Sequence, residues 1–189
     1  MSTKFTHSKT SHSFIYSDYD LFDMVNQRVK GANTGATVLV PHVCNNVDSF
    51  GAGFAAQVAE KFPSVKEDYH LLGKTFLKNN LGYAQILKVF EDPKYKHKLY
   101  IVNMIAQNGT KSHTNPRPLN YLGLARAMLS VTQFIHNNTG FKNKSENVEI
   151  HAPKFGSGLA GGNWSFISDL IDDIWGKHFV TVYNYPPKK

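Results

Sequence analysis

Apolar residues recur along the chain in two alternating patterns, short β-branched runs and longer stretches with helical spacing. The short runs predict strands at 13–17, 37–44, 84–89, 99–106, 148–151 and 179–183. The run 37–44 (TVLVPHVC) is almost continuously apolar, which is typical of a strand buried on both faces of a sheet. Pro41 interrupts this run and indicates a strand end or an irregularity.

Stretches with helical spacing separate most of these strands. The clearest is an amphipathic stretch whose apolar residues recur at alternating three- and four-residue intervals: Tyr121, Leu124, Met128, Val131 and Ile135. Further helices are predicted from Asp20 onward, over 53–62, from there to Gly73, and over 166–174. The stretch 108–118 is polar and holds a glycine and two prolines, which predicts a loop.

Strands that alternate with helices predict one three-layer α/β/α domain with a central mixed sheet of roughly six strands. The chain has no internal repeat, no low-complexity segment and no linker long enough to divide it. We expect a flexible N-terminal segment at 1–12, a folded domain at 13–185 and a short basic tail at 186–189. The order of the strands in the sheet does not follow from periodicity.

Composition narrows the class of protein. The 189 residues are 41% hydrophobic and 19% charged, which excludes a disordered or coiled-coil chain. No apolar run is long enough to span a membrane, and the first residues lack the apolar core of a secretory signal. Cys44 is the single cysteine, so a disulfide framework within the chain is excluded and structural zinc is disfavoured. We therefore expect a cytoplasmic protein, most simply a monomer, without a membrane partner.

The formal net charge of +7 favours an anionic partner. Nucleic acid, a phosphorylated small molecule and a membrane surface all satisfy this condition, and a lysine-rich surface that only aids solubility satisfies it too. The 9 histidines show no zinc-ligand spacing, so we expect neither a metal nor a cofactor.

Two glycine-rich loops each join a predicted strand to a predicted helix. They are 45–55 (NNVDSFGAGFA) and 154–164 (KFGSGLAGGNW). Each exposes backbone N–H groups beside a helix N-terminus, where unpaired donors and the positive dipole end suit a phosphate. Neither loop matches the Walker pattern or the dinucleotide fingerprint. One such loop is often only turn chemistry, but two in one small domain predict a clamp on a diphosphate.

A series of short motifs stands in a fixed order along the chain. They are Asp20-Leu21-Phe22, His42-Val43-Cys44-Asn45, Gly51-Ala52-Gly53-Phe54-Ala55, Lys61-Phe62-Pro63, Asn103-Met104-Ile105-Ala106-Gln107, Asn120-Tyr121, Pro153 and 156–164 (GSGLAGGNW). This series resembles the macro domain family, whose members recognise ADP-ribose, over nearly the whole stretch from Ser13 to Tyr185. It is most similar to the branch of ADP-ribose 1″-phosphate phosphatases and related phage-encoded proteins. The resemblance implies the macro domain fold.

The resemblance also implies a set of ligand-binding residues. Asp20 would accept a hydrogen bond from the adenine amino group, beside the backbone of Leu21, or would only cap the following helix. The amides near Gly53 and Phe54 would contact the proximal phosphate, and 157–160 would wrap the diphosphate and the distal ribose. The whole implied set is Asp20, Leu21, Phe50, Gly51, Ala52, Gly53, Phe54, Gly156, Ser157, Gly158, Leu159, Ala160 and Tyr183.

Two aromatic assignments within this set have alternatives. Phe50 would flank the distal ribose or would pack in the core. The adenine face would be covered by an aromatic residue near the end of the last strand, either Tyr183 or Tyr185.

The catalytic residues implied by the resemblance are His42, Asn45 and Asp48. His42 would act as a general acid–base group or attack phosphorus, or it is a buried histidine bonded to backbone. Asn45 would reach the distal ribose hydroxyls, or it is a turn residue bonded to its own backbone. Asp48 would orient a water beside the distal ribose, or it caps the following turn.

Three further polar positions bear on the reaction. His113 and Arg117 would hold a terminal phosphate or are simply solvated. Some macro domains that remove ADP-ribose from acidic side chains pair a lysine with an aspartate in the second glycine loop. Here Ala160 stands where that aspartate is expected, so the pair is incomplete even if Lys74 lies nearby.

The resulting hypothesis is an ADP-ribose-binding enzyme that hydrolyses ADP-ribose 1″-phosphate to ADP-ribose and phosphate. One alternative is a hydrolase that removes ADP-ribose from modified protein or nucleic acid. Another is a non-catalytic reader of ADP-ribose. A basic nucleic-acid-binding module ranks last, because the sequence has no recognisable stacking motif for RNA.

Overall fold

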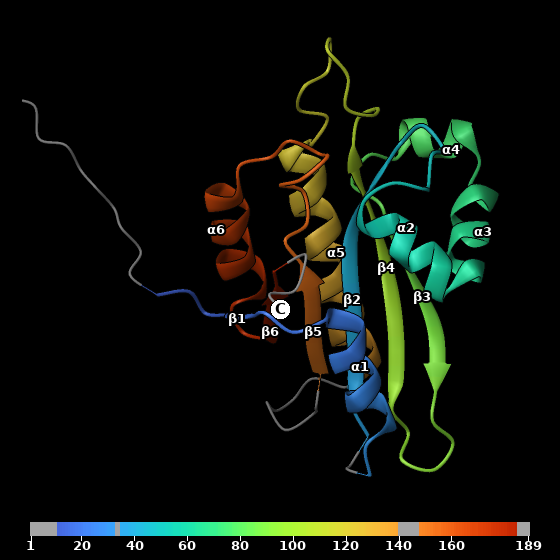
Figure 1. Cartoon of the computed structure of the whole chain (residues 1–189), viewed down its shortest axis with the longest axis vertical. Helices are drawn as coiled ribbons and strands as arrows, with labels where there is room; N and C mark the ends of the chain where they lie inside the picture. The colour runs from blue at the N-terminus through green and yellow to red at the C-terminus, as the bar shows by residue number, and fades with distance from the viewer. Residues whose placement is uncertain (1–10, 33–34, 140–147, 185–189) are drawn as a thin grey trace, which may run out of the picture.

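The computed structural model describes residues 11–32, 35–139 and 148–184 (Figure 1). Most of the expected N-terminal segment, the expected basic tail and Tyr185 lie outside the described residues. The elements run in the order β1 (Ile15–Ser17), α1 (Leu21–Lys30), β2 (Thr37–Asn45), α2 (Phe54–Lys61), α3 (Pro63–Leu71), α4 (Lys74–Asn79), β3 (Ala84–Glu91), β4 (Lys98–Gln107), α5 (Tyr121–Thr139), β5 (Val148–Pro153), α6 (Trp164–Trp175) and β6 (Phe179–Tyr183).

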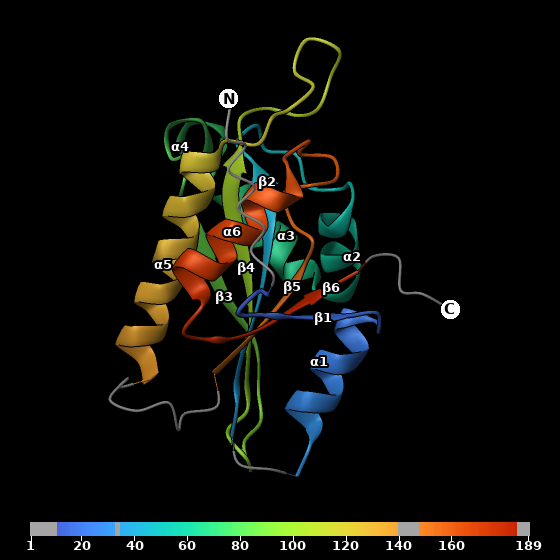
Figure 2. The same cartoon turned by 90° about the vertical axis from the view of Figure 1, so that its left-hand side faces the viewer.

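The strands form one mixed sheet in the order β1-β6-β5-β2-β4-β3. Five of them are parallel to one another, and β3 at one edge pairs antiparallel with β4. Helices α5 and α6 cover one face of the sheet, and α1 to α4 lie on the other (Figures 1 and 2). The predicted three-layer α/β/α fold is confirmed. None of the helices in these ranges has the length and apolar character that crossing a membrane requires.

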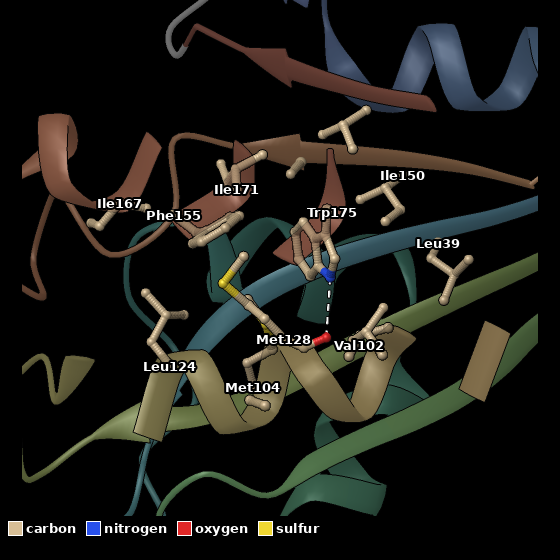
Figure 3. Close-up of a cluster of buried hydrophobic side chains, with 14 of the residues drawn as sticks. Leu39, Val102, Met104, Leu124, Met128, Ile150, Phe155, Ile167, Ile171 and Trp175 are labelled. Carbon is tan, nitrogen blue, oxygen red and sulfur yellow. Dashed lines mark hydrogen bonds between the residues drawn. The ribbon is translucent and has the colours of Figure 1, made fainter. Parts of the chain in front are cut away.

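Each face of the sheet has its own apolar core. On the α5–α6 side, Met104 of β4 packs with Met128 of α5 and Trp175 of α6, all fully buried (Figure 3). The indole Nε1 of Trp175 donates to the carbonyl oxygen of Met128 at 3.1 Å, which ties the two helices together. On the opposite side, Phe22 of α1 and Tyr69 of α3 pack over the other face of β2 and β4. The alternation along the central strands therefore serves two cores, as a doubly covered sheet requires.

One helix was not predicted, and the structure distinguishes the two alternatives for Pro41, a strand end or an irregularity. Helix α4 was not predicted, because its six residues bury only Leu77 and give no periodicity to read. Pro41 does not end its strand: β2 continues to Asn45 and stays paired with β4 throughout. The ladder between β2 and β5, however, ends at Leu39, two residues before Pro41. Because proline has no N–H to donate, it fits where the strand has a single continuing partner.

Helix α5 provides a matched test of the core. Met128→Ala removes a fully buried side chain and should lower the free energy of unfolding by about 2–5 kcal/mol. Leu129→Ala removes its neighbour in the same helix, which is 55% exposed, and should change it by less than about 0.5 kcal/mol. Denaturant unfolding of both variants measures the difference. Similar losses in the two would contradict the assignment of α5's buried face.

Candidate functional site

A cavity of about 560 Å³ opens at the carboxyl ends of β2, β4 and β5. Most of the predicted site residues line it, and they come from β2 and from both glycine loops. These are His42, Asn45, Gly51, Ala52, Gly53, Phe54, Gly156, Ser157, Gly158, Leu159 and Ala160. The cavity lies where β2 has β4 on one side and β5 on the other. This is the switch point at which open α/β sheets bind their ligands.

Three other predicted residues lie beside the cavity rather than in it. Asp20, Leu21 and Tyr183 line a smaller hollow of about 10 Å³, which shares Phe54 and Pro153 with the main cavity. The Oδ1 atom of Asp20 accepts from the backbone N–H of Asp23 at 2.9 Å, so the expected helix cap is present.

A chain of hydrogen-bonded side chains fixes the position of Tyr183. Its hydroxyl is 2.7 Å from Nδ1 of His151, whose Nε2 lies 3.1 Å from Glu149. Arg28 of α1 donates to the other oxygen of Glu149 at 2.7 Å. Burial raises the pKa of Tyr183 to about 12, so its hydroxyl stays protonated. The ring is therefore fixed at the edge of the hollow beside Asp20.

The side chain of Asn45 organises the first glycine loop. Its Oδ1 accepts from the backbone N–H groups of Val47 and Ser49 at 3.0 and 3.2 Å, and its Nδ2 donates to the Ser49 carbonyl at 2.6 Å. The buried hydroxyl of Tyr69 also donates to Asn45, at 2.8 Å to its carbonyl and 3.0 Å to Oδ1. These bonds match the turn role that was the alternative for this residue.

Two expected site residues are directed elsewhere. Phe50 is 4% exposed, is not among the cavity-lining residues, and its ring packs against His42 and Tyr69 with centroids 5.7 and 5.0 Å away. The core-packing alternative therefore describes Phe50. Asp48 also lies outside the cavity lining, and its Oδ1 is 2.6 Å from Nδ1 of His70 on α3. The carboxylate thus fastens the loop to α3 instead of facing the cavity.

His42 stands at the head of a buried chain of polar groups. Gln85 donates from Nε2 to the carbonyl of Asp68 at 2.9 Å, so its Oε1 accepts from Nδ2 of Asn103 at 2.9 Å. The Oδ1 of Asn103 is then the acceptor for Nε2 of His42, at 2.7 Å. Because a carbonyl can only accept, it sets the direction of every bond in the chain and assigns the proton of His42 to Nε2.

The environment keeps His42 neutral. The residue is 1% exposed, and burial lowers its pKa to about 4 despite the hydrogen bond that it donates to Asn103, which acts in the opposite direction. Its Nδ1 lies 3.8 Å from the sulfur of Cys44, whose pKa burial raises. At neutral pH the imidazole is therefore an uncharged, hydrogen-bonded member of the cavity floor and a weak base.

The glycines of the two loops serve different purposes. Gly53 and Gly156 have positive φ angles, 58° and 75°, which other residues rarely adopt. A Cβ at Gly162 would collide with Leu119 and with the carbonyl of Gly156. Gly51 and Gly158, in contrast, have ordinary φ angles, and a Cβ on either would meet nothing within 4 Å. Nothing in the described fold requires glycine at these two positions, which border the cavity, so they leave space for a ligand.

The two loops meet across the cavity. Leu159, at the tip of the second loop and 53% exposed, has its Cδ1 3.2 Å from where a Cβ of Gly53 would lie. Gly53 is also the N-cap of α2, and it offers no side chain to satisfy the first N–H groups of that helix. The first residues of α2 and residues 157–160 of the second loop border the cavity, where backbone amides can donate to an anion.

Several lining residues escaped the sequence-based prediction. Gln107, Thr110 and Lys111 come from β4 and the polar loop after it, and Lys154 begins the second glycine loop. The sequence feature that could have identified Lys111 is its position in a polar loop that follows a buried strand. His113 and Arg117 of the same polar loop, and Lys74, are not lining residues, and the Arg117 guanidinium lies 4.9 Å from the Tyr121 ring.

The charge of the lining is one-sided. Lys111 and Lys154 are its two cationic residues, and none of the described residues that line it is an aspartate or glutamate. Within residues 11–32, 35–139 and 148–184, no group of three or more histidine, cysteine, aspartate or glutamate side chains is placed to hold a metal. The arrangement suits a ligand bearing phosphates, bound by backbone amides with two lysines in support.

Comparison with known proteins agrees with this geometry, although no family profile matches the chain. An uncharacterised 17.5 kDa protein of Enterobacteria phage T4 is 27% identical over 150 residues, which cover 78% of this chain and 86% of the phage protein. The ADP-ribose 1″-phosphate phosphatase of the yeast Lodderomyces elongisporus is 26% identical over 145 residues, 76% of this chain and 84% of the yeast protein.

Solved structures share the fold. A protein of unknown function from Bacteroides thetaiotaomicron superposes with a TM-score of 0.69 at 26% identity, covering 90% of this chain and 97% of that one. A macrodomain protein from Streptomyces coelicolor gives 0.60 at 24% identity, with 91% and 99% coverage. Thermosipho africanus DarTG in complex with ADP-ribose gives 0.58 at 17% identity, with 80% and 39% coverage.

The fold is that of the macro domains, as the sequence motifs predict. Within that class, the chain is similar to the ADP-ribose 1″-phosphate phosphatases and to the phage protein.

The buried imidazole should be visible in the pH dependence of stability. Between pH 6.5 and 4, His42 becomes protonated in the unfolded chain but not in the folded chain. The free energy of unfolding therefore falls by up to about 3 kcal/mol as the pH is lowered through this range. His42→Asn keeps a donor for Asn103 but does not titrate. Denaturant unfolding across this range should give a shallower decline for the variant. Parallel curves would show that His42 keeps an ordinary pKa in the folded state.

Proposed function

We propose that this macro domain binds ADP-ribose in the cavity between its glycine loops and hydrolyses ADP-ribose 1″-phosphate to ADP-ribose and phosphate. The observation that carries the proposal is the one-sided lining: amides of two glycine loops and two lysines, without a carboxylate among the described lining residues. The yeast relatives named ADP-ribose 1″-phosphate phosphatase and the structural neighbour bound to ADP-ribose support the same ligand class.

The phosphates are the best-matched part of this ligand. The diphosphate would lie between the N-terminus of α2 at Gly53 and the loop around Gly158, where backbone amides from both sides converge. The open positions of Gly51 and Gly158 would let the phosphate oxygens approach the backbone closely. Lys154, which follows β5, would contribute charge at the same place.

The base would lie over the small hollow beside the cavity. Asp20 uses Oδ1 for its helix cap, and its second carboxylate oxygen would accept from the adenine amino group. The ring of Tyr183, fixed through His151, would support the base. The hollow is much too small to enclose a purine, so the base would pack across its opening.

The chemistry requires little of the protein's own acid–base groups. Water would attack phosphorus and the bond from phosphorus to the 1″-oxygen would break. One proton of the water would stay on the released phosphate, and the other would pass by way of a phosphate oxygen to the departing 1″-oxygen, which leaves as the hydroxyl of ADP-ribose. Phosphoryl transfer of this kind depends mainly on positioning and on stabilising charge on the phosphate oxygens. Cleavage of an ester to a protein side chain would gain more from a general base, and Ala160 occupies the expected aspartate position within the cavity. His42 would then support the floor of the cavity. A phosphate oxygen of the substrate, and not His42, would take the proton from the attacking water.

A non-catalytic reader of ADP-ribose is the second candidate. The neutral, buried His42 and the placement of Asp48 against α3 favour it, because His42 is a weak base and Asp48 does not line the cavity. The two candidates share the binding site and differ only in turnover.

The direct test is incubation of the full chain with ADP-ribose 1″-phosphate in buffer containing a metal chelator. Release of inorganic phosphate, proportional to protein and above a buffer control, is expected. Tight ADP-ribose binding by calorimetry without phosphate release would identify a reader and refute the phosphatase. Absence of both would refute the ADP-ribose site itself.

Gly158→Val tests the location of the ligand. The added side chain meets no protein atom at its Cβ, so the melting temperature should stay within about 2 °C of wild type. Its methyl groups would occupy space needed by the ligand, and the Kd for ADP-ribose should rise about tenfold or more. Gly31→Val, at another glycine with ordinary φ outside the cavity, is the control. Unchanged binding by Gly158→Val would place the ligand elsewhere.

A further inference from the structure

The order of the strands in the sheet determines the order in which the site residues lie along the cavity. The five parallel strands end at one edge of the sheet in the sequence β1, β6, β5, β2, β4. Each is followed or ended by a site residue: Asp20, Tyr183, Lys154, Asn45 and Lys111, in that order across the sheet. With neighbouring strands about 4.8 Å apart, the distance from the first to the last is about 19 Å. Asp20 and Lys111 therefore stand at opposite ends of the site.

This order orients an elongated ligand, given the proposed function. With its base beside Asp20 and its diphosphate between the glycine loops, the ligand must end at the loop that follows β4. That loop contributes Thr110 and Lys111 to the cavity lining. In ADP-ribose 1″-phosphate, the group at this end is the terminal phosphate, the one feature that distinguishes substrate from product.

Side-chain hydrogen bonds hold the loop after β4, which forms one wall of the cavity. Asn46, 6% exposed, accepts from the backbone N–H of Gly109 at 2.8 Å and donates to Oδ1 of Asn108 at 3.1 Å. Asn115 donates to the carbonyls of Asn108 and Thr110 at 2.9 and 3.2 Å. The loop, yellow-green in Figure 1, rises beyond the carboxyl ends of the strands. Side-chain amides thus hold the backbone on both sides of Thr110 in place.

The two cations of the lining occupy different walls. Lys154 follows β5, and its ammonium lies 5.3 Å from the ring of Tyr16 on β1 and 5.8 Å from that of Trp164 at the start of α6. Lys111 is the cation on the β4 side. No ion pair to a carboxylate is found for either lysine within the described part of the chain. Lys111 therefore has its charge available at the end of the cavity away from the base.

We propose that Lys111, assisted by the hydroxyl of Thr110, binds the terminal phosphate and makes the site prefer ADP-ribose 1″-phosphate over ADP-ribose. The contact is a charge-assisted hydrogen bond to a dianion, which is stronger than a neutral one. The same contact persists as charge redistributes over the phosphate oxygens during hydrolysis. It forms no covalent bond and is absent from the product complex, so product leaves more easily than substrate.

The test compares two ligands across matched variants of the full chain. Lys111→Met removes the charge, Lys111→Arg keeps it, Thr110→Val removes the hydroxyl, and Lys66→Met removes a lysine from the exposed surface of α3. For each, kcat/KM for phosphate release from ADP-ribose 1″-phosphate and the Kd of ADP-ribose are measured at one ionic strength. Where wild type releases no phosphate, the Kd of ADP-ribose 1″-phosphate replaces kcat/KM.

Lys111→Met should lower kcat/KM, or raise the Kd of ADP-ribose 1″-phosphate, by about 10- to 100-fold and change the Kd of ADP-ribose by less than about threefold. Lys111→Arg should recover most of the loss, Thr110→Val should show a smaller one, and Lys66→Met should match wild type. Equal losses for both ligands would assign Lys111 to the diphosphate and overturn the inference. No loss for either ligand would overturn it as well. In both cases phosphate release by wild type would leave the proposed function intact, whereas a wild type that binds neither ligand would refute both.

Discussion

The end of the β2–β5 ladder at Leu39 is the constraint on which the site depends. Beyond that residue β2 pairs only with β4, and its last residues are free of β5 on the other side. Pro41 fits this arrangement, because a strand with two continuing partners has no place for a residue without an N–H. The cavity opens between the separated strand ends, and both glycine loops follow from them. One departure from regular pairing thus creates the room and aims the backbone amides.

The buried polar chain under the cavity limits the chemistry that the site can perform. His42 donates to Asn103, Asn103 donates to Gln85, and Gln85 donates to a backbone carbonyl. The polar atoms that form these bonds are therefore paired within the core. Burial keeps the imidazole uncharged near neutral pH, so the floor of the cavity contains a weak base instead of a strong one. Stabilisation of anions then falls to amides and lysines.

Sequence patterns predicted the elements, the three layers and the two glycine loops, because each depends on local spacing that a single segment carries. They did not predict α4, where one buried leucine leaves no period. The placements of Phe50 and Asp48 depend on α3 and on the core beneath the loop, and no local pattern records these contacts. Lys111 was missed for a related reason. Its position at the site follows from β4 lying next to β2, and strand order is a property of the whole sheet.

Strand β1 has a consequence for the dynamics of the molecule. It is three residues long, lies at the edge of the sheet and is paired with β6 alone. Short edge elements open at a lower free energy than central ladders, and amide hydrogens there exchange sooner. Asp20 lies three residues after this strand, whereas β2 and β4 are paired with each other in the interior of the sheet. We therefore expect local opening to begin at the end of the sheet near β1 and Asp20 before it reaches the central strands.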